Sequence, residues 1–479
     1  MIVEPTCGKG HFILASLQVF DSIEEIYGIE INASYLESLK RSIFQYYLDN
    51  PATKKVKINL FNQNVFNFNF HSIKKNFCDR EVLAIGNPPW VTSSKLGMMQ
   101  SQNLPKKVNY KKAKGLDAIT GKGNFDIAEY ICRQMIELLK EEKGTMAFLL
   151  KNHVIKNLVY ELKNSNRAFG NVIQYNINTK EEFGASVAAA LLCAKLGEKS
   201  DAQCQVQDFY TLKKIQKYGW VGDNFVSDVV SYKQYGYMDG ASPLKWWSGV
   251  KHDCSKVMEL TERDGRYVNG LGQIVCIEND MIYPLLKSSD IKGDKITAVR
   301  KYIIITQKSA FEDTNSMGNS YPLAYSYLNE HISFFDSRGS SVYNKRSRFS
   351  IFGIGDYSFA KYKVVISGLY KKPHFSLVGE IGGKPVMVDD TCYLLGFDDY
   401  SPAYVAQRIL NSTPVQSFIH SLLFVEAKRV INKELLMRID FFKIVRKLRR
   451  EDLGIDESDW RNFILYLESK SEPEQFVLF

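Results

Sequence analysis

The residues whose types most clearly suit catalysis or ligand binding are Asn87, Pro88, Pro89 and Trp90, which follow a short apolar run at residues 82–86. The run is bounded by turn signals, so it predicts a buried strand with these four residues at its carboxyl end. In open α/β sheets that end is where ligands bind. Prolines have no N–H to donate, so the Asn oxygen and a neighbouring carbonyl form two acceptors for one amino group, beside a flat indole ring. The pattern suits a planar base with an exocyclic amine; the alternative is a rigid turn capped by a core tryptophan.

A glycine-containing turn opens the chain. Residues 1–3 predict a strand that runs into Glu-Pro-Thr-Cys-Gly-Lys-Gly at 4–10, and apolar residues then recur at helical spacing from Phe12. Such a strand, turn and helix bring backbone N–H groups close to a ligand. A second predicted strand at 26–29 ends in Glu30, where a carboxylate can accept both hydroxyls of a ribose.

Further strands and helices alternate along the first part of the chain. A helix is expected at 125–139, and the remaining elements are a helix at 35–48 and strands at 56–60, 145–150, 172–177 and 187–195. About seven strands alternating with helices predict an α/β fold with a mainly parallel, doubly wound seven-stranded sheet. The polar break at 196–201 predicts a domain boundary. We therefore expect a catalytic domain at 1–200 and a mixed α+β domain at 201–479.

Composition limits the class of protein. The 479 residues carry a formal charge of +9 and 45% hydrophobic residues, enough for two or three domains and compatible with a nucleic-acid partner. The eight cysteines show no Cys-x-x-Cys spacing, so neither a disulfide framework nor a metal site is expected. No apolar run approaches the roughly 20 residues that cross a bilayer, so we expect a cytoplasmic protein without a membrane partner.

Three basic segments are candidates for contacts with nucleic-acid phosphates. One lies in a long loop at 95–122, one interleaves cations and aromatics at 338–349, and one lies near the end of the chain. Each has an alternative interpretation as a solvated charged surface. The candidate residues are Lys106, Lys107, Lys111, Arg338, Lys345, Arg346, Arg348, Lys428 and Arg429.

The order of these motifs resembles the gamma class of adenine-N6 DNA methyltransferases of restriction–modification systems. In that class the glycine turn precedes Asn-Pro-Pro-aromatic, and a target-recognition domain follows, here 201–479. The resemblance implies S-adenosylmethionine as cofactor, with Glu30 on its ribose and Asn64 near its adenine, where the family usually has Asp. The residues expected against its methionine and ribose are Glu4, Pro5, Thr6, Cys7, Gly8 and Gly10.

The resemblance also implies the reaction and its partners. Asn87 and the Pro88 carbonyl would accept hydrogen bonds from the N6 amine of a flipped adenine, and Trp90 would stack on that base. Double-stranded DNA is then the substrate, and a cognate restriction endonuclease is the expected functional partner.

Alternatives remain at this stage. The family carries a helix upstream of the glycine turn, whereas residues 1–3 alone precede it here, so the chain is a downstream half or a partner subunit supplies that helix. A catalytically silent DNA-recognition subunit would also lack it. Related enzymes methylate RNA or protein, but the long second domain favours DNA, and Asn87 rather than Ser disfavours a cytosine target.

Overall fold

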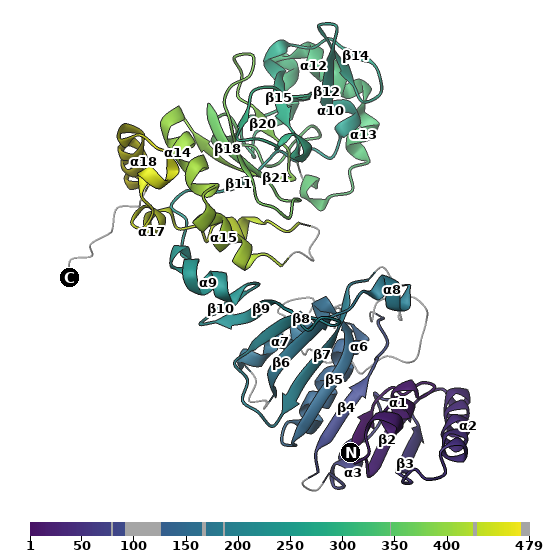
Figure 1. Ribbon diagram of the computed structural model, residues 1–479. Helices are drawn as coiled ribbons and strands as arrows, with labels where there is room; N and C mark the ends of the chain where they lie inside the picture. The colour runs from purple at the N-terminus through teal and green to yellow at the C-terminus, as the bar shows by residue number, and fades with distance from the viewer. Residues whose placement is uncertain are drawn as a thin grey trace, which may run out of the picture. The chain divides into compact units, whose positions relative to one another are not determined.

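The chain forms two compact units, Met1–Val229 and Val230–Phe479 (Figure 1). The computed structural model describes residues 1–77, 80–91, 126–164, 169–184, 187–344, 346–424 and 429–470. The candidate residues Lys106, Lys107, Lys111, Lys345 and Lys428 lie outside these ranges.

The first unit is built on one sheet with the strand order β10-β9-β8-β6-β7-β5-β4-β1-β2-β3. Its strands pair in parallel except where β7 and β9 run opposite to their neighbours. The strands are β1 (Ile2–Glu4), β2 (Glu25–Glu30), β3 (Lys57–Asn62), β4 (Val82–Gly86), β5 (Gly144–Lys151), β6 (Phe169–Asn176), β7 (Ala189–Leu196), β8 (Gln203–Asp208), β9 (Lys214–Val221) and β10 (Asn224–Val226).

The predicted strand number was too low, because this sheet contains ten strands within the described residues rather than seven. The polar stretch at 196–201 connects β7 to β8 within the same sheet, and the first compact unit continues past residue 200 to Val229. Strand β6 leaves its outer backbone groups available, and β8 pairs with them in parallel, from Val172 opposite Cys204 onward. A polar break marks a turn, but its composition does not separate a turn between strands from a linker between domains.

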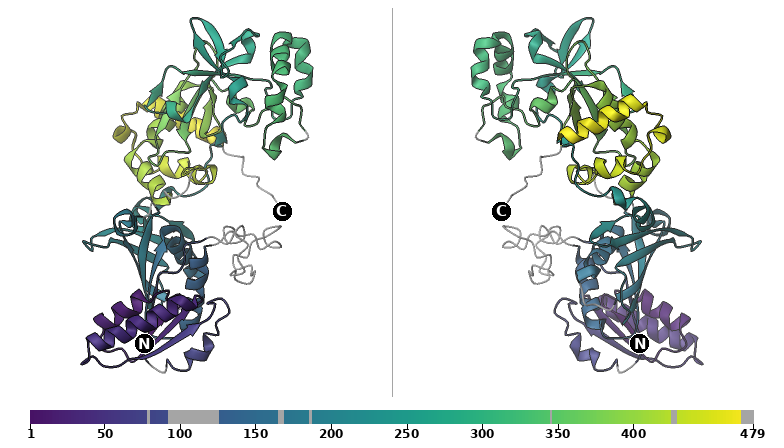
Figure 2. Two further views of the ribbon diagram at one scale, coloured as in Figure 1. Left: turned by 90° about the vertical axis from the view of Figure 1, so that its right-hand side faces the viewer. Right: turned by 90° about the vertical axis from the view of Figure 1, so that its left-hand side faces the viewer.

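Helices of the first unit pack on the sheet through apolar faces. Helices α1 (His11–Val19) and α2 (Ala33–Asp49) contact each other and share a core with side chains of β1, β2 and β4, including Ile2, Ile26 and Leu83. They are the purple helices of the left-hand view in Figure 2. The others are α3 (His71–Lys74), α6 (Ile127–Leu139), α7 (Asn152–Glu161) and α8 (Thr179–Phe183).

The second unit contains two sheets, ordered β11-β21-β18-β19-β16 and β14-β13-β12-β17-β15-β20. Most neighbouring strands are antiparallel, while β15 with β20 and β16 with β19 are parallel. The strands are β11 (Trp247–Ser248), β12 (Glu259–Arg263), β13 (Arg266–Asn269), β14 (Ile274–Val275), β15 (Ile282–Leu286), β16 (Lys295–Ile296), β17 (Lys301–Ile304), β18 (Tyr362–Ser367), β19 (Phe375–Val378), β20 (Met387–Val388) and β21 (Cys392–Phe397).

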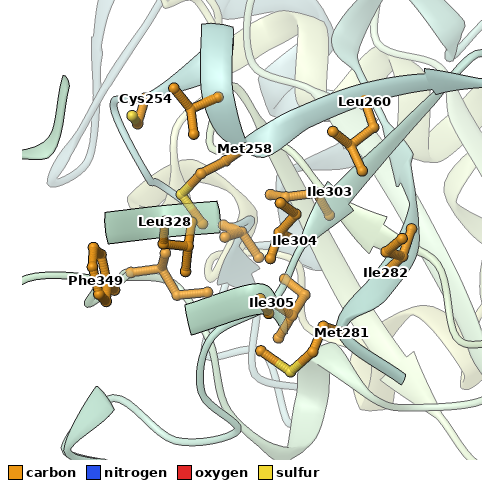
Figure 3. Close-up of a cluster of buried hydrophobic side chains, with 14 of the residues drawn as sticks. Cys254, Met258, Leu260, Met281, Ile282, Ile303, Ile304, Ile305, Leu328 and Phe349 are labelled. Atoms are coloured by element: carbon orange, nitrogen blue, oxygen red, sulfur yellow. The ribbon is translucent and has the colours of Figure 1, made fainter. Parts of the chain in front are cut away.

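The second unit has its own apolar core. Figure 3 shows Met258 of α10, Ile303 and Ile304 of β17, Leu328 of α12 and Phe349 in one cluster of buried apolar side chains. Elsewhere α14 covers the five-stranded sheet and contacts α18, the yellow helix in the right-hand view of Figure 2. The helices are α9 (Val229–Tyr235), α10 (Ser255–Met258), α11 (Met317–Ser320), α12 (Pro322–Glu330), α13 (Ile332–Asp336), α14 (Tyr400–Leu410), α15 (Thr413–Leu422), α16 (Lys433–Leu436), α17 (Phe441–Val445) and α18 (Glu457–Lys470).

Within the described residues, every helix is too short or too polar to cross a membrane.

Candidate active site

The turn after β1 wraps over the end of β2 through backbone hydrogen bonds. The Cys7 N–H donates to the Ile29 carbonyl (2.9 Å), and the Gly10 N–H donates to the Cys7 carbonyl (2.7 Å). Gly10 has φ +79°, and a Cβ there would stand 2.0 Å from the Leu39 side chain, so glycine is required. The thiol of Cys7 points into the core beneath α1, where burial raises its pKa, so Cys7 serves the turn through its backbone.

Glu30 joins this turn to the end of β2. Its carboxylate oxygens accept hydrogen bonds from the Gly8 N–H (3.0 Å) and the Asn32 N–H (2.8 Å). Asn32 also caps α2, since its side chain accepts from the Ser34 N–H (3.0 Å). The carboxylate is therefore held at the carboxyl edge of the sheet, with capacity left for further donors.

Two buried polar groups near the turn lack hydrogen-bond partners among the described residues. These atoms are Oε2 of Glu4 and Oγ1 of Thr6. Glu4 is 2% exposed, and burial raises the pKa of its carboxyl well above the ordinary value, against a hydrogen bond from the Ile13 N–H. Burying polar atoms without partners is costly, so both atoms indicate a place where a polar ligand completes the structure.

A cavity of about 330 Å³ lies at the carboxyl ends of β1 to β4. Six predicted residues, from four separate parts of the sequence, meet in its wall: Pro5, Thr6, Glu30, Asn64, Asn87 and Pro89. The remaining lining residues are Ile29, Ile31, Gln63, Val65, Phe66, Val91, Ile127 and Ile131. The sequence interpretation did not select these eight. The apolar residues 127 and 131 fit the helical spacing that predicts α6. That spacing does not show that this face of the helix lines a cavity.

Asn64 follows β3 and forms a turn of its own. Its Oδ1 accepts a hydrogen bond from the Phe66 N–H (3.0 Å), which directs the Phe66 ring toward Tyr130 of α6 with centroids 5.4 Å apart.

The Asn87–Trp90 motif follows β4 directly, as predicted from the apolar run. Asn87 and Pro89 are exposed at the cavity, whereas Pro88 is buried. The Trp90 indole N–H donates to the Leu149 carbonyl of β5 (3.2 Å), which fixes the half-buried ring. Trp90 and Pro88 are not among the residues that line the cavity.

The described basic candidates of the second unit differ in how far they are already engaged. Arg338 donates to the carbonyls of Ser350 (2.8 Å) and Arg348 (2.6 Å), and its guanidinium stacks 3.7 Å from the Tyr343 ring centroid. The exposed Arg346 lies over the exposed ring of Phe311. Arg338 thus braces its own loop, while Arg346 presents its charge to solvent.

Two further candidates form ion pairs with neighbouring carboxylates. Arg348 pairs with Asp336 (3.0 Å), and Arg429 pairs with Asp390 (3.2 Å). Both arginines are exposed, so these pairs are weak and can exchange for a phosphate. Among the described residues, no group of three or more His, Cys, Asp or Glu side chains is arranged to hold a metal ion.

Comparison with known proteins defines the class. The chain is 37% identical over 442 residues to the type II methyltransferase M.NspV from Nostoc sp. (strain ATCC 29411 / PCC 7524), covering 92% of this chain and 90% of that protein. No family model matches the chain.

Among solved structures, the type IIL restriction–modification enzyme MmeI in complex with DNA matches over 99% of this chain and 71% of its own, with a TM-score of 0.53 and 9% identity. The M protein of the type I restriction enzyme EcoKI matches over 43% of this chain and 44% of its own, with a TM-score of 0.29 and 11% identity, too low a score to support an argument.

The likeness to M.NspV defines the class of this chain, which is a methyltransferase. The identity with M.NspV goes further, and the chain belongs to the family of type II DNA methyltransferases of restriction–modification systems. S-adenosylmethionine is the methyl donor. The cavity suits it, because the Glu30 carboxylate, the unpartnered Oγ1 of Thr6 and an apolar wall line one space at the strand ends.

Proposed function

We propose that this chain transfers a methyl group from S-adenosylmethionine to the exocyclic N6 amine of an adenine extruded from duplex DNA, as the modification part of a restriction–modification system. The observation that carries the proposal is the position of Asn87, exposed at the rim of the cofactor cavity and directly after β4. Pro5, Thr6, Glu30, Asn64, Asn87 and Pro89 line one space, which supports the gamma-class order of motifs.

Different residues of the cavity would contact different parts of the cofactor. Glu30 would accept hydrogen bonds from the ribose hydroxyls, through a carboxylate already held by the Gly8 and Asn32 N–H groups. Pro5 and Thr6 would contact the methionine part, together with Glu4, Cys7, Gly8 and Gly10 of the same turn. Asn64 would accept from the adenine amine of the cofactor, and Ile127 and Ile131 would form the apolar wall against its ring.

The chemistry requires position more than acid–base power. When bound, S-adenosylmethionine supplies an electrophilic methyl carbon and a neutral thioether leaving group. The Asn87 Oδ1 and the Pro88 carbonyl would each accept a hydrogen bond from the N6 amine. These two bonds would favour a pyramidal nitrogen whose lone pair faces the methyl group. Trp90 would stack on the extruded base, and one N6 proton is lost to solvent after the N–C bond forms.

The second unit would act as the target-recognition domain. Exposed cations such as Arg346, Arg348 and Arg429 would contact phosphates and so help to offset the cost of extruding a base. A restriction endonuclease that cleaves the unmodified sequence is the expected functional partner.

The test is transfer of a labelled methyl group from S-adenosylmethionine to mixed-sequence duplex DNA, followed by digestion to nucleosides. We expect N6-methyldeoxyadenosine from the parent and a loss of at least about 100-fold in the Asn87→Ala variant, as for removal of a positioned polar group at a reacting atom. The matched control is Asn50→Ala, which removes an exposed amide that bonds only the Tyr46 carbonyl at the end of α2. Label in a cytosine, in RNA or in protein would refute the proposal.

A further inference from the structure

A partly buried lysine anchors the Asn87–Trp90 motif from the neighbouring strand. Lys151 is the last residue of β5, which pairs in parallel with β4. Its ammonium donates to the Trp90 carbonyl (2.9 Å) and to Oδ2 of Asp126 (2.8 Å). The Lys151 side chain is 14% exposed and that of Asp126 is 1% exposed, so solvent screens the pair little.

Asp126 connects this anchor to the cofactor wall. Its Oδ1 accepts from the Ala128 N–H (3.1 Å) and caps α6, the helix that carries Ile127 and Ile131 into the cavity. The Ile127 N–H in turn donates to the Val91 carbonyl (2.9 Å). Two successive carbonyls after the prolines are therefore held by groups from β5 and from α6.

The motif needs such an anchor because of its own composition. Pro88 and Pro89 have no N–H groups, so two of the four residues of the motif offer the neighbouring strands only a carbonyl. A lysine ammonium makes a stronger hydrogen bond than a neutral donor does. Buried ion pairs gain little stability over apolar residues of the same size, so the pair contributes position more than stability. Among the described residues, His153 also faces this pair, with Nε2 3.9 Å from the Asp126 Oδ2.

We propose that Lys151 is a positioning residue for methyl transfer, which holds the main chain of Asn87–Trp90 at a fixed distance from the cofactor wall by bridging Trp90 and Asp126. The inference rests on the proposed function, because the motif must be the one that receives the target amine. Lys151 itself touches neither substrate nor cofactor in this role.

The test compares single-turnover rates of methyl transfer with the affinity for S-adenosylmethionine. We expect Lys151→Met to lower the transfer rate about 100-fold, since displacements near 1 Å at a reacting centre have that effect, while the cofactor Kd changes less than about threefold. Lys151→Arg keeps a charged donor and should recover most of the rate. Lys163→Met is the matched control, because Lys163 also bridges a carbonyl, that of Gly222, and a carboxylate, that of Asp223.

Two more variants separate positioning from folding. Lys151→Met leaves Asp126 buried without its partner, so the double variant Asp126→Asn/Lys151→Met removes both charges and should keep the rate defect in a folded protein. Asp126→Asn alone retains the helix cap and the Lys151 bond to Trp90, and should transfer within about fivefold of the parent.

The outcomes are distinct. A normal rate in the double variant, an equal loss in Lys163→Met, or a rise in cofactor Kd that matches the fall in rate would overturn the positioning role while leaving the proposed function intact. No transfer to DNA by the folded parent would overturn both.

Discussion

Each unit contains a buried glutamate, and the pKa values of the two carboxyl groups are shifted in opposite directions. Glu4 of the first unit has one oxygen without a partner among the described residues, and burial raises its pKa. Burial alone would also raise the pKa of Glu259 in the second unit, but hydrogen bonds from His252 and Lys287 outweigh it and lower the pKa to about 2. The Lys287 ammonium also reaches Asp389 (2.6 Å), which completes a satisfied network.

The difference is between a buried carboxyl with an unpartnered oxygen and a cluster of charged groups whose members pair with one another, at the wall of a separate cavity of about 660 Å³. Oε2 of Glu4 and Oγ1 of Thr6 have no hydrogen-bond partner among the described residues. The charged groups around Lys287, by contrast, form hydrogen bonds with one another. Unmet polar groups are tolerated where function requires them. The contrast supports the proposed cofactor site in the first unit, whereas the ion pairs of Lys287 join β12 to the residues that follow β15 and β20 within the second.

The largest expected effect that tests this contrast is the acid sensitivity of the second unit. A carboxyl with a pKa of about 2 when folded and about 4.5 when unfolded stabilises the fold above pH 4.5 and loses that contribution as the pH falls toward 2. The loss amounts to at most about 3 kcal/mol for Glu259. Glu259→Gln should remove this part of the pH dependence, measured by denaturant unfolding between pH 2 and 7. An unchanged pH profile in that variant would show that the network does not hold the fold.

The affinity for the cofactor tests the first unit of this comparison. Glu30→Gln should weaken binding of S-adenosylmethionine about 30-fold to 100-fold by calorimetry, because a neutral amide accepts hydroxyl hydrogen bonds less strongly than a carboxylate. The controls are Glu37→Gln, at an exposed carboxylate paired with Lys40, and Glu259→Gln in the second unit. Equal weakening in either control would mean that loss of charge or folding, rather than the ribose contact, explains the result.

The smallest expected effect distinguishes two arginines within the second unit. Arg346→Met should weaken duplex DNA binding about threefold to tenfold and lower the slope of log K against log salt by about one, because one exposed cation is lost. Arg338→Met should leave that slope unchanged and lower the unfolding temperature, because its donors hold backbone carbonyls. Fluorescence anisotropy at several salt concentrations measures the slope for both variants, and thermal unfolding measures the change in temperature. A changed slope in Arg338→Met with an unchanged slope in Arg346→Met would contradict the assignment.

Local sequence determined the ligand-facing pieces of the first unit. The strand predicted at 82–86 is β4, and Asn87 follows it; the strand predicted at 26–29 lies within β2, which ends in Glu30. The helix expected at 125–139 is α6, with Asp126 as its cap. These features follow from apolar runs, turn residues and caps, whose conformational preferences act over a few residues.

Tertiary structure alone decided which of these pieces meet and which charges are used. The addition of β8 to β6, the pairing of Lys151 with Asp126, and the bond from Arg338 to the His252 carbonyl join residues far apart in the sequence. No local propensity encodes such contacts, because they depend on which surfaces the folded sheet and helices bring together and on how deeply each charge is buried. Six residues of the cavity wall could therefore be selected from the sequence, but the groups that hold them in place could not.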